Sequence, residues 1–210
     1  MLPRCRAAGR CYHPAVAERE TPSPTTSSLP AAVRRVIEAA ERKGVTLEIT
    51  VFGESTHTAE QAAAAVGAEL GQIVKSLVFV VPGSDGGEHL PVLCLVSGAN
   101  RVDLARLAAV TGEPAIRRAT AREANDLTGY VIGGIPPLGH ASSLRTIMDP
   151  DLGRFPVVWA AAGTQNAVFP VPPATLRSLA NATVAPIAEE PASSPTTVPP
   201  AGSAPDPGAA

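Results

Sequence analysis

The order of apolar and polar positions predicts helices interleaved with strands between residues 30 and 185. Apolar residues three and four apart indicate amphipathic helices, whereas alternating or continuous β-branched runs indicate strands. Capping-box sequences begin two of the helices, at Thr58-Ala59-Glu60-Gln61 and Thr120-Ala121-Arg122-Glu123. In chain order, the expected helices are 30–43, 58–67, 103–110, 120–128 and 173–179, and the expected strands are 45–52, 73–81, 90–96, 144–148, 157–161 and 167–171.

Some of these elements are joined by short turns, as at Asp85-Gly86-Gly87 between the second and third strands. Helices interspersed with strands and short turns are typical of an α/β fold with a mixed sheet. We therefore predict one folded domain over residues 30–185.

The two ends of the chain have a different composition. Residues 1–29 and 186–210 are rich in Pro, Ser, Thr and Ala, and such segments bury too little apolar surface to offset the entropy of ordering. We expect disordered tails at both ends, the second of them rich in Pro and Ala.

Charge gives no sign of a strong polyanion binder, because the net charge of the chain is -2. A local cluster of Arg117, Arg118 and Arg122 could still contact a few phosphates. The alternative is that these arginines form the solvated face of a helix.

Cysteine usage indicates a reducing compartment. Cys5, Cys11 and Cys94 are an odd set without the dense spacing of a disulfide scaffold. A zinc site would need a fourth ligand at finger-like spacing, so we expect neither a metal nor a cofactor. No apolar stretch reaches the length of a secretory or membrane-spanning segment, so we expect a cytoplasmic protein without membrane contact.

Lys75 is the first candidate for chemistry. It is a lone charge within the apolar run Ile73-Val74-Lys75-Ser76-Leu77-Val78-Phe79. Burial of an unpaired ammonium is costly, so this side chain either reaches out to the surface or projects into a polar pocket.

The second candidate is the run Gly129-Tyr130-Val131-Ile132-Gly133-Gly134-Ile135-Pro136-Pro137-Leu138-Gly139-His140. A stiff loop with few side chains leaves backbone N–H groups open to a ligand oxygen. A tight structural turn would have the same composition.

These two motifs, followed by Ala162-Gly163 on a late strand, closely resemble the YbaK/EbsC family. Members of that family are free-standing aminoacyl-tRNA deacylases, related to the editing domain of bacterial prolyl-tRNA synthetase. The resemblance covers roughly residues 30–185. It implies a mainly antiparallel, curved sheet with surrounding helices, and hydrolysis of the ester in mischarged tRNA, commonly tRNA(Pro).

The resemblance also implies roles for individual residues. Lys75 would place an ammonium near the ester carbonyl or the adjacent phosphate, and Gly133 would offer its backbone N–H to the same region. His140 is either a proton-transfer residue or a packed, structural histidine. Asn100 belongs to a turn that could border the pocket. The expected substrate-binding residues are Phe52, Ser76, Asn100, Gly134, Pro137, Gly139, Ala161 and Gly163.

Phe52 and Ala161 depart from the family pattern. Phe52 keeps an aromatic wall but loses the hydroxyl of a family tyrosine, and Ala161 replaces a serine of the cysteinyl-specific members. Both changes remove hydrogen-bonding capacity, so the accepted amino acid stays open. Cys94 is expected to be a small core residue and no nucleophile.

The expected partners are the CCA end of a mischarged tRNA and, as a further expectation, prolyl-tRNA synthetase. The competing hypothesis is a catalytically silent module that binds a tRNA end, a nucleotide or a synthetase. The sequence leaves the oligomeric state open.

Overall fold

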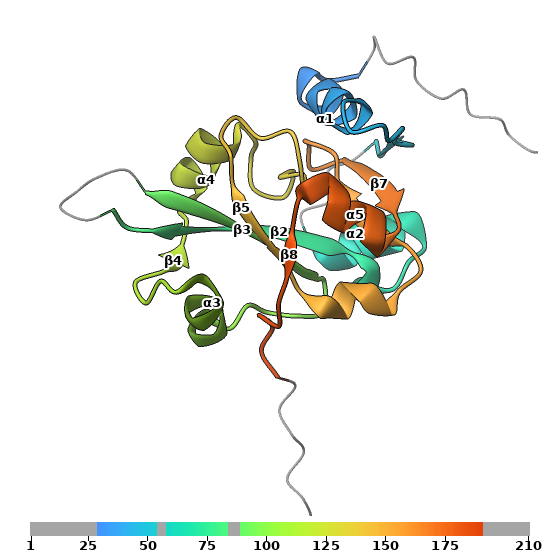
Figure 1. Ribbon diagram of the computed structural model, residues 1–210. Helices are drawn as coiled ribbons and strands as arrows, with labels where there is room; N and C mark the ends of the chain where they lie inside the picture. The colour runs from blue at the N-terminus through green and yellow to red at the C-terminus, as the bar shows by residue number, and fades with distance from the viewer. Residues whose placement is uncertain (1–28, 54–57, 84–88, 191–210) are drawn as a thin grey trace, which may run out of the picture.

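The structure, a computed structural model, describes residues 29–53, 58–83 and 89–190 (Figure 1). Its helices are α1 (Ala31–Glu41), α2 (Ala59–Val66), α3 (Leu104–Thr111), α4 (Ala121–Thr128) and α5 (Pro173–Ala180), with short 3-10 helices η2 (Leu70–Gln72) and η4 (Pro150–Arg154). Its strands are β1 (Thr50–Val51), β2 (Val74–Val81), β3 (Leu90–Ser97), β4 (Arg117–Arg118), β5 (Arg145–Met148), β6 (Val158–Ala161), β7 (Ala167–Val171) and β8 (Thr183–Val184).

Side-chain caps fix where the helices begin. The Thr58 hydroxyl accepts a hydrogen bond from the Gln61 N–H at 3.2 Å and starts α2. Thr120 and Glu123 form the full capping box of α4, since each side chain bonds the other's backbone N–H. These local signals confirm the helix starts expected from the sequence.

The strands form two sheets, one with the order β4-β2-β3-β5-β8 and the other with the order β1-β7-β6. β2 pairs antiparallel with β3 and β4, whereas β5 pairs parallel with β3 and β8. A bridge between Ile73 and Trp159 joins the two sheets. The mixed, mainly antiparallel α/β fold is therefore confirmed.

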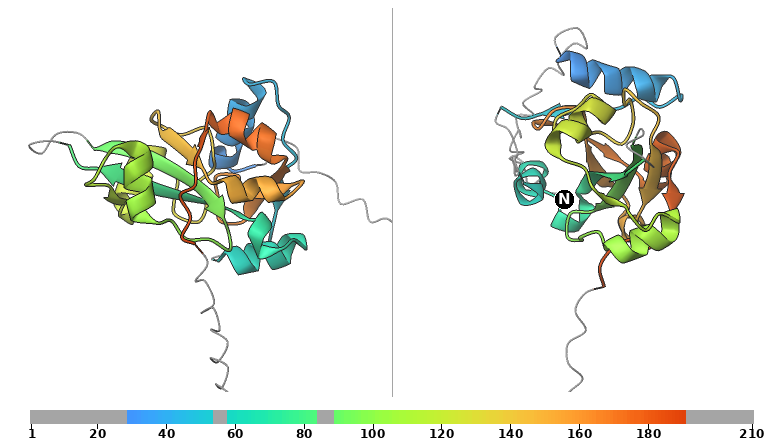
Figure 2. Two further views of the ribbon diagram at one scale, coloured as in Figure 1. Left: turned by 60° about the horizontal axis from the view of Figure 1, so that its bottom comes forward. Right: turned by 90° about the vertical axis from the view of Figure 1, so that its left-hand side faces the viewer.

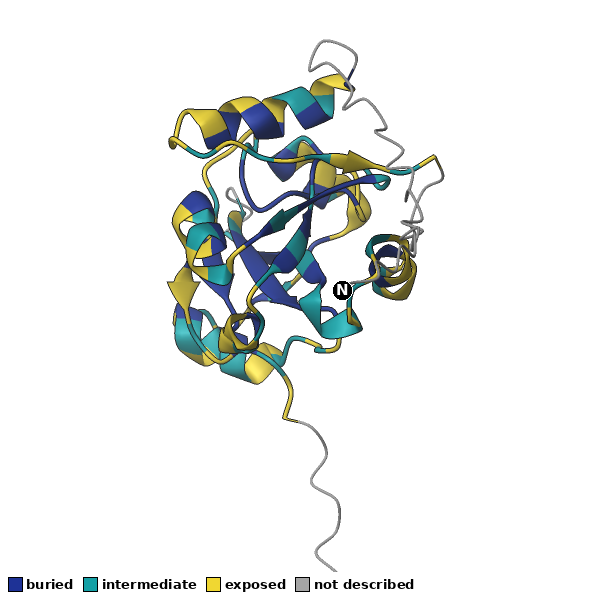
Figure 3. Ribbon diagram, turned by 90° about the vertical axis from the view of Figure 1, so that its right-hand side faces the viewer, coloured by how far each residue is buried: buried dark blue, intermediate teal, exposed yellow. Residues whose placement is uncertain are grey.

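The long β2–β3 hairpin runs through the middle of the molecule, with helices on its outer sides (Figures 1 and 2). One face of β2, with Val74, Val78 and Val80, joins the main apolar core beneath α1. The opposite face, with Phe79 and Val81, packs in a second core with Leu107 of α3. Figure 3 shows the buried strands enclosed by helices whose outer faces are exposed.

The expected strand over residues 45–52 is wrong for most of its length. β1 pairs with β7 only at Thr50 and Val51, so the residues before it have no strand partner. Val45, Leu47 and Ile49 are half-buried and pack against the main core. Alternation here reflects side chains that contact the core from an irregular segment.

The ordered chain also continues past the expected boundary at residue 185. Residues 186–190, called here the C-terminal strap, pack on the domain, and Ile187 is fully buried. The Asp149 carboxylate accepts hydrogen bonds from the Ile187 and Ala188 N–H groups at 3.0 and 2.9 Å. Leu29, expected in the first tail, is also buried. The rest of both tails and the turn at 85–87 lie outside the described residues.

Among the helices that the structure describes, none is long and apolar enough to cross a bilayer.

Candidate active site

Lys75 lies where β2 has an open edge. β4 covers that edge only opposite Phe79 and Val80, so residues 74–77 have no β4 partner. The Lys75 side chain is half-buried, and its Nζ donates a hydrogen bond to the Asn100 carbonyl at 3.3 Å. The lysine therefore turns into the protein and does not simply extend into solvent.

A cavity of about 650 Å³ opens around this edge of β2. Lys75, Ser76, Asn100, Gly133 and Ala161, all expected at the site, line it together. Its walls come from β2, α2, β6, the loop before His140, the turn after β3 and the C-terminal strap. Further lining residues include Thr58, Arg101, Arg118, Ile132, Ile135, Trp159, Thr164, Gln165 and Glu189.

Burial is the main influence on the Lys75 ammonium and lowers its pKa from the usual value. The carboxylate of Glu60, on α2, opposes this shift because an opposite charge favours the protonated form. Arg101 and Arg118 lower the pKa of Lys75 further by like-charge repulsion. These cations and Lys75 line the same cavity, so its mouth is suited to an anionic group.

The loop before His140 is held rigidly by contacts within itself. The buried Tyr130 donates its hydroxyl hydrogen to the Gly139 carbonyl at 2.8 Å, and His140 Nε2 donates to the Pro136 carbonyl at 2.7 Å. Pro136 and Pro137, in the middle of the loop, are buried. The loop therefore presents a preformed edge to the cavity.

Close backbone packing explains why positions 134 and 163 hold glycine. A Cβ on Gly134 would lie 2.8 Å from the backbone of Thr164. Gly163 has φ +99°, and a Cβ there would lie 2.7 Å from the carbonyl oxygen of Ala32. Gln165 Nε2 also donates to the Ile132 carbonyl at 2.8 Å, so the loop and the turn after β6 form one wall.

Gly133 stands on the cavity side of that wall. The Gly134 N–H bonds the Val131 carbonyl at 3.0 Å, whereas no hydrogen bond between described residues uses the Gly133 N–H. Ser76 Oγ is also buried without a hydrogen-bond partner among those residues. Both are polar groups of cavity-lining residues without a hydrogen-bond partner in the described part of the chain.

His140 does not line the cavity. Its ring meets the Tyr130 ring edge to face at 6.2 Å, and burial lowers its pKa despite the opposing hydrogen bond to Pro136. A ring nitrogen that donates to a carbonyl oxygen carries a proton. In the structure, His140 therefore packs against Tyr130 and Pro136, outside the cavity lining.

Five other expected residues lie outside the cavity lining: Phe52, Gly134, Pro137, Gly139 and Gly163. Gly134 lies against Thr164, Gly139 and Gly163 lie against α1, and Pro137 is buried. Phe52 follows β1, at the far edge of the β1-β7-β6 sheet, where its N–H bonds the Asn166 carbonyl at 2.7 Å. The aromatic wall expected from Phe52 is supplied by Trp159 of β6, the strand next to β2.

One signal in the sequence could have found Trp159. It lies two residues before Ala161 on the same strand, and residues two apart share a face of a strand. Arg101, Thr164, Gln165 and Glu189 carry no such signal, because they lie in turns or in the C-terminal strap.

The arginine cluster divides into three environments. Arg117 and Arg118 form β4 and do not lie on a helix, and Arg118 lines the cavity. Arg117 is held by the Glu123 carboxylate through hydrogen bonds of 2.7 and 3.0 Å. Arg122 is exposed on α4, 3.7 Å from Asp126.

Cys94 lies in the second core, where burial raises the pKa of its thiol to about 12. It is therefore protonated at neutral pH and poorly suited to nucleophilic attack. Within the described residues, no three His, Cys, Asp or Glu side chains are grouped so as to hold a metal ion.

A model of the aminoacyl-tRNA editing domain family matches residues 53–179. The chain therefore belongs to this family, as the sequence motifs predict.

Named relatives and a solved structure agree with this assignment. The chain is 31% identical over 117 residues to the multifunctional Ser/Thr-tRNA deacylase ProXp-y of Escherichia coli (strain K12), which covers 56% of this chain and 68% of that protein. It is 27% identical over 130 residues to EbsC of Enterococcus faecalis, provisionally named a Cys-tRNA(Pro)/Cys-tRNA(Cys) deacylase; the match covers 62% of this chain and 76% of that protein. A crystal structure provisionally described as a trans-editing enzyme for prolyl tRNA synthetase is 47% identical, with a TM-score of 0.70, and covers 77% of this chain and 99% of that one.

Proposed function

We propose that this protein is an aminoacyl-tRNA deacylase that acts in trans and hydrolyses the ester of mischarged tRNA(Pro). The observation that carries the proposal is the cavity itself, which Lys75 and Gly133 line together, one with an ammonium and the other with a backbone N–H that has no partner among the described residues. Both are groups that stabilise negative charge on oxygen. The names of the relatives support the same class of reaction.

The proposed reaction needs no covalent intermediate with the protein. A water molecule adds to the ester carbonyl carbon, and negative charge develops on the carbonyl oxygen. Lys75 and the Gly133 N–H offset that charge. The bond to the ribose oxygen then breaks, the amino acid leaves with the water oxygen, and the ribose oxygen takes up the proton released by the water.

Since His140 lies outside the cavity and Cys94 is buried in the core, neither is assigned the proton transfer. We assign it to a substrate group, such as the neighbouring ribose hydroxyl. The protein then contributes the charge stabilisation by Lys75 and Gly133, and it holds the ester in position for attack. The proposal requires no metal or cofactor.

Arg101 and Arg118 support the recognition of a tRNA end. Neither forms an ion pair among the described residues, and both line the cavity near Lys75. The phosphates of the CCA end are negatively charged, so these two arginine side chains would attract them.

Ser76 bears on which amino acid is accepted. Its buried hydroxyl has no hydrogen-bond partner among the residues that the structure describes, and a buried polar group gains most when a ligand supplies one. Ala161 and Trp159 give the same cavity apolar walls. We therefore expect a small acyl side chain with a hydroxyl or thiol to be preferred over alanine.

A catalytically silent binding module is the second candidate. It is favoured by the lining that the described residues give the cavity, which includes no histidine and, in Glu189 of the C-terminal strap, a single carboxylate. Such a module would hold a tRNA end without turnover.

A panel of mischarged tRNAs distinguishes the two candidates. tRNA(Pro) charged with Ser, Cys, Thr or Ala is incubated with the full chain, and release of the amino acid is followed. Deacylation that is fastest with Ser or Cys supports the proposal. Tight binding without release on every tRNA tested would favour the silent module.

The same proposal assigns the protein to the cytoplasm, where charged tRNA is used, and to association with prolyl-tRNA synthetase. The association is supported by the solved relative, which is described as a trans-editing enzyme for prolyl tRNA synthetase.

A further inference from the structure

The turn after β3 supplies the hydrogen-bond acceptor of the Lys75 ammonium. Lys75 Nζ donates to the backbone carbonyl of Asn100 at 3.3 Å, and the Asn100 N–H bonds the Ser97 carbonyl at 3.0 Å. A carbonyl oxygen moves with its peptide plane. Whatever fixes residues 100 and 101 therefore also fixes the acceptor of Lys75.

Asp151 fixes this turn from one side. The Asn100 side-chain amide donates to Asp151 Oδ2 at 2.8 Å. Asp151 lies on η4, and its own N–H bonds the Asp149 carboxylate at 3.1 Å. Asp149 is buried and its N–H bonds the Leu95 carbonyl at 2.9 Å, so the base of η4 is tied to the central hairpin.

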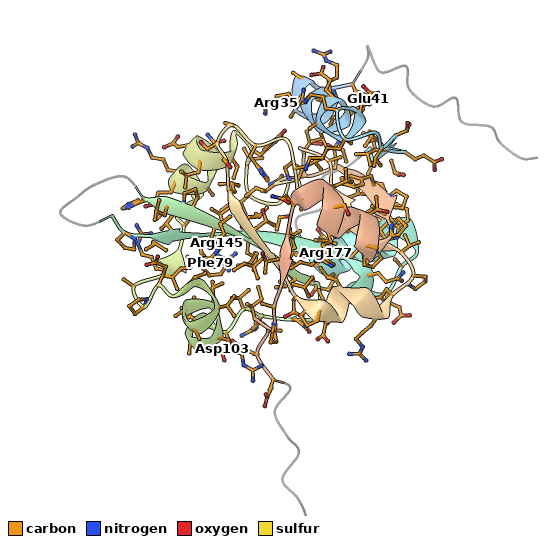
Figure 4. The ribbon with its side chains drawn as sticks, in the orientation of Figure 1. Arg35, Glu41, Phe79, Asp103, Arg145 and Arg177 are labelled. Carbon is orange, nitrogen blue, oxygen red and sulfur yellow. The ribbon has the colours of Figure 1, made fainter. Side chains whose placement is uncertain are left out.

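The C-terminal strap fixes the same turn from the other side. The Glu189 N–H bonds the Arg101 carbonyl, and the Asp103 N–H bonds the Ile187 carbonyl, both at 2.9 Å. Asp103 is the N-cap of α3, and Figure 4 shows it beside the C-terminal strap. Asp149 joins the two supports, because it also accepts from the N–H groups of the strap.

Among the described residues, the Asp151 carboxylate makes one other polar contact. Its other contact is Arg154 Nη1 at 4.0 Å, and the Arg154 side chain is 75% exposed. Exposed pairs of this kind contribute little to stability. The short bond to the Asn100 amide is therefore the main interaction of the Asp151 side chain.

We propose that Asp151 is a positioning residue for Lys75, acting through Asn100, with the C-terminal strap as the second support of the turn. This inference rests on the proposed function only for its effect on turnover. Asp151 does not line the cavity, so its role is to hold the acceptor of the ammonium and not to contact substrate.

Two substitutions test the route through the amide. Asp151→Ala removes the acceptor of the Asn100 amide, whereas Asp151→Asn keeps a neutral oxygen in its place. Asp126→Ala is the matched control, because Asp126 is exposed on α4 and, within the described part of the chain, pairs with Arg122 alone. Thermal unfolding of all three variants checks that each is folded at the assay temperature.

Turnover gives the first readout. Asp151→Ala should lower kcat for deacylation about tenfold with KM changed less than twofold, and Asp151→Asn should recover most of the loss. Wild-type kcat in Asp151→Ala, or equal losses in both variants, would overturn the inference.

Direct titration of Lys75 gives a readout that does not need turnover. The chain holds only two lysines, Lys43 and Lys75, so NMR signals of labelled lysine are readily assigned. A hydrogen bond from the ammonium favours its charged form, so its loss lowers the pKa. The other charges that face Lys75 are Glu60 on α2, Arg101 on the turn and Arg118 on β4, and none of them changes in these variants.

Asp151→Ala should therefore lower the pKa of Lys75, while Asp151→Asn should leave the pKa of Lys75 near the wild-type value. An unchanged Lys75 titration in Asp151→Ala would overturn the inference. If the wild type deacylates none of the tRNAs, the proposed function fails, and this titration still decides whether Asp151 positions Lys75.

Discussion

Ile187 lies in a segment whose composition predicts a tail, yet its side chain is fully buried. It belongs to the same apolar cluster as Leu107 of α3 and Val96 of β3. Full burial of an isoleucine side chain stabilises a fold by about 1.5–3 kcal/mol. Truncation to alanine adds a cavity term, and such core substitutions cost about 2–5 kcal/mol.

Ile187→Ala should thus lower the free energy of unfolding by about 2 kcal/mol, at the low end because the strap lies at an edge of the core. For a chain of this size, that corresponds to a fall in Tm of about 4–8 °C. Val184→Ala is the matched control, since Val184 is 43% exposed, and its effect should stay within about 0.5 kcal/mol.

The assay is urea unfolding, followed by circular dichroism and by fluorescence of Trp159, the one tryptophan of the chain. A lower midpoint with an unchanged m-value would show a loss of stability without a change in the surface exposed on unfolding. An Ile187→Ala midpoint equal to that of Val184→Ala would refute the packing of the strap.

Two further stability predictions follow from the site's surroundings. Gly163→Ala should lower the free energy of unfolding by at least about 1 kcal/mol, because φ is positive and the added Cβ meets a backbone oxygen. Gly153→Ala is the control, because its added Cβ enters open space and should not cause such a loss. Chemical denaturation of both variants measures the difference. The Arg117 guanidinium holds the pKa of Glu123 well below its usual range, so the contribution of this pair is present above about pH 4.3 and lost as the pH falls. Arg117→Ala should therefore weaken the pH dependence of unfolding between about pH 2 and 5, and a curve parallel to that of the wild type would contradict the pairing.

Local chemistry made the helices predictable from the sequence. Thr120 and Glu123 cap α4 with groups three residues apart, so the signal and the structure that it forms lie in one short segment. The β2–β3 hairpin is similarly local, since its two apolar runs are neighbours in the chain.

The cavity walls could not be predicted in the same way. They depend on which strands become neighbours, and the Ile73–Trp159 bridge joins segments far apart in sequence. That pairing brings Trp159 into the cavity and leaves Phe52 at the far edge of the smaller sheet. Motif resemblance pointed to Lys75 and Gly133, which line the cavity, but equally to residues outside the lining such as Gly139.

The C-terminal strap shows the limit of composition as a guide. Its neighbours in sequence are mostly Pro, Ala and Ser, and only Ile187 has a large apolar side chain. The segment is ordered because Asp149, remote in sequence, accepts hydrogen bonds from its N–H groups.

The central claim is that the Lys75 ammonium stabilises the transition state of ester hydrolysis. The measurement that tests it most directly compares single-turnover deacylation of mischarged tRNA(Pro) by wild type, Lys75→Ala and the control Lys43→Ala. Lys43 donates to the Leu179 carbonyl and does not line the cavity. Loss of one such stabilising donor costs about 100- to 1000-fold in rate. We expect a loss of that size for Lys75→Ala and a wild-type rate for Lys43→Ala, whereas a wild-type rate for folded Lys75→Ala would contradict the account.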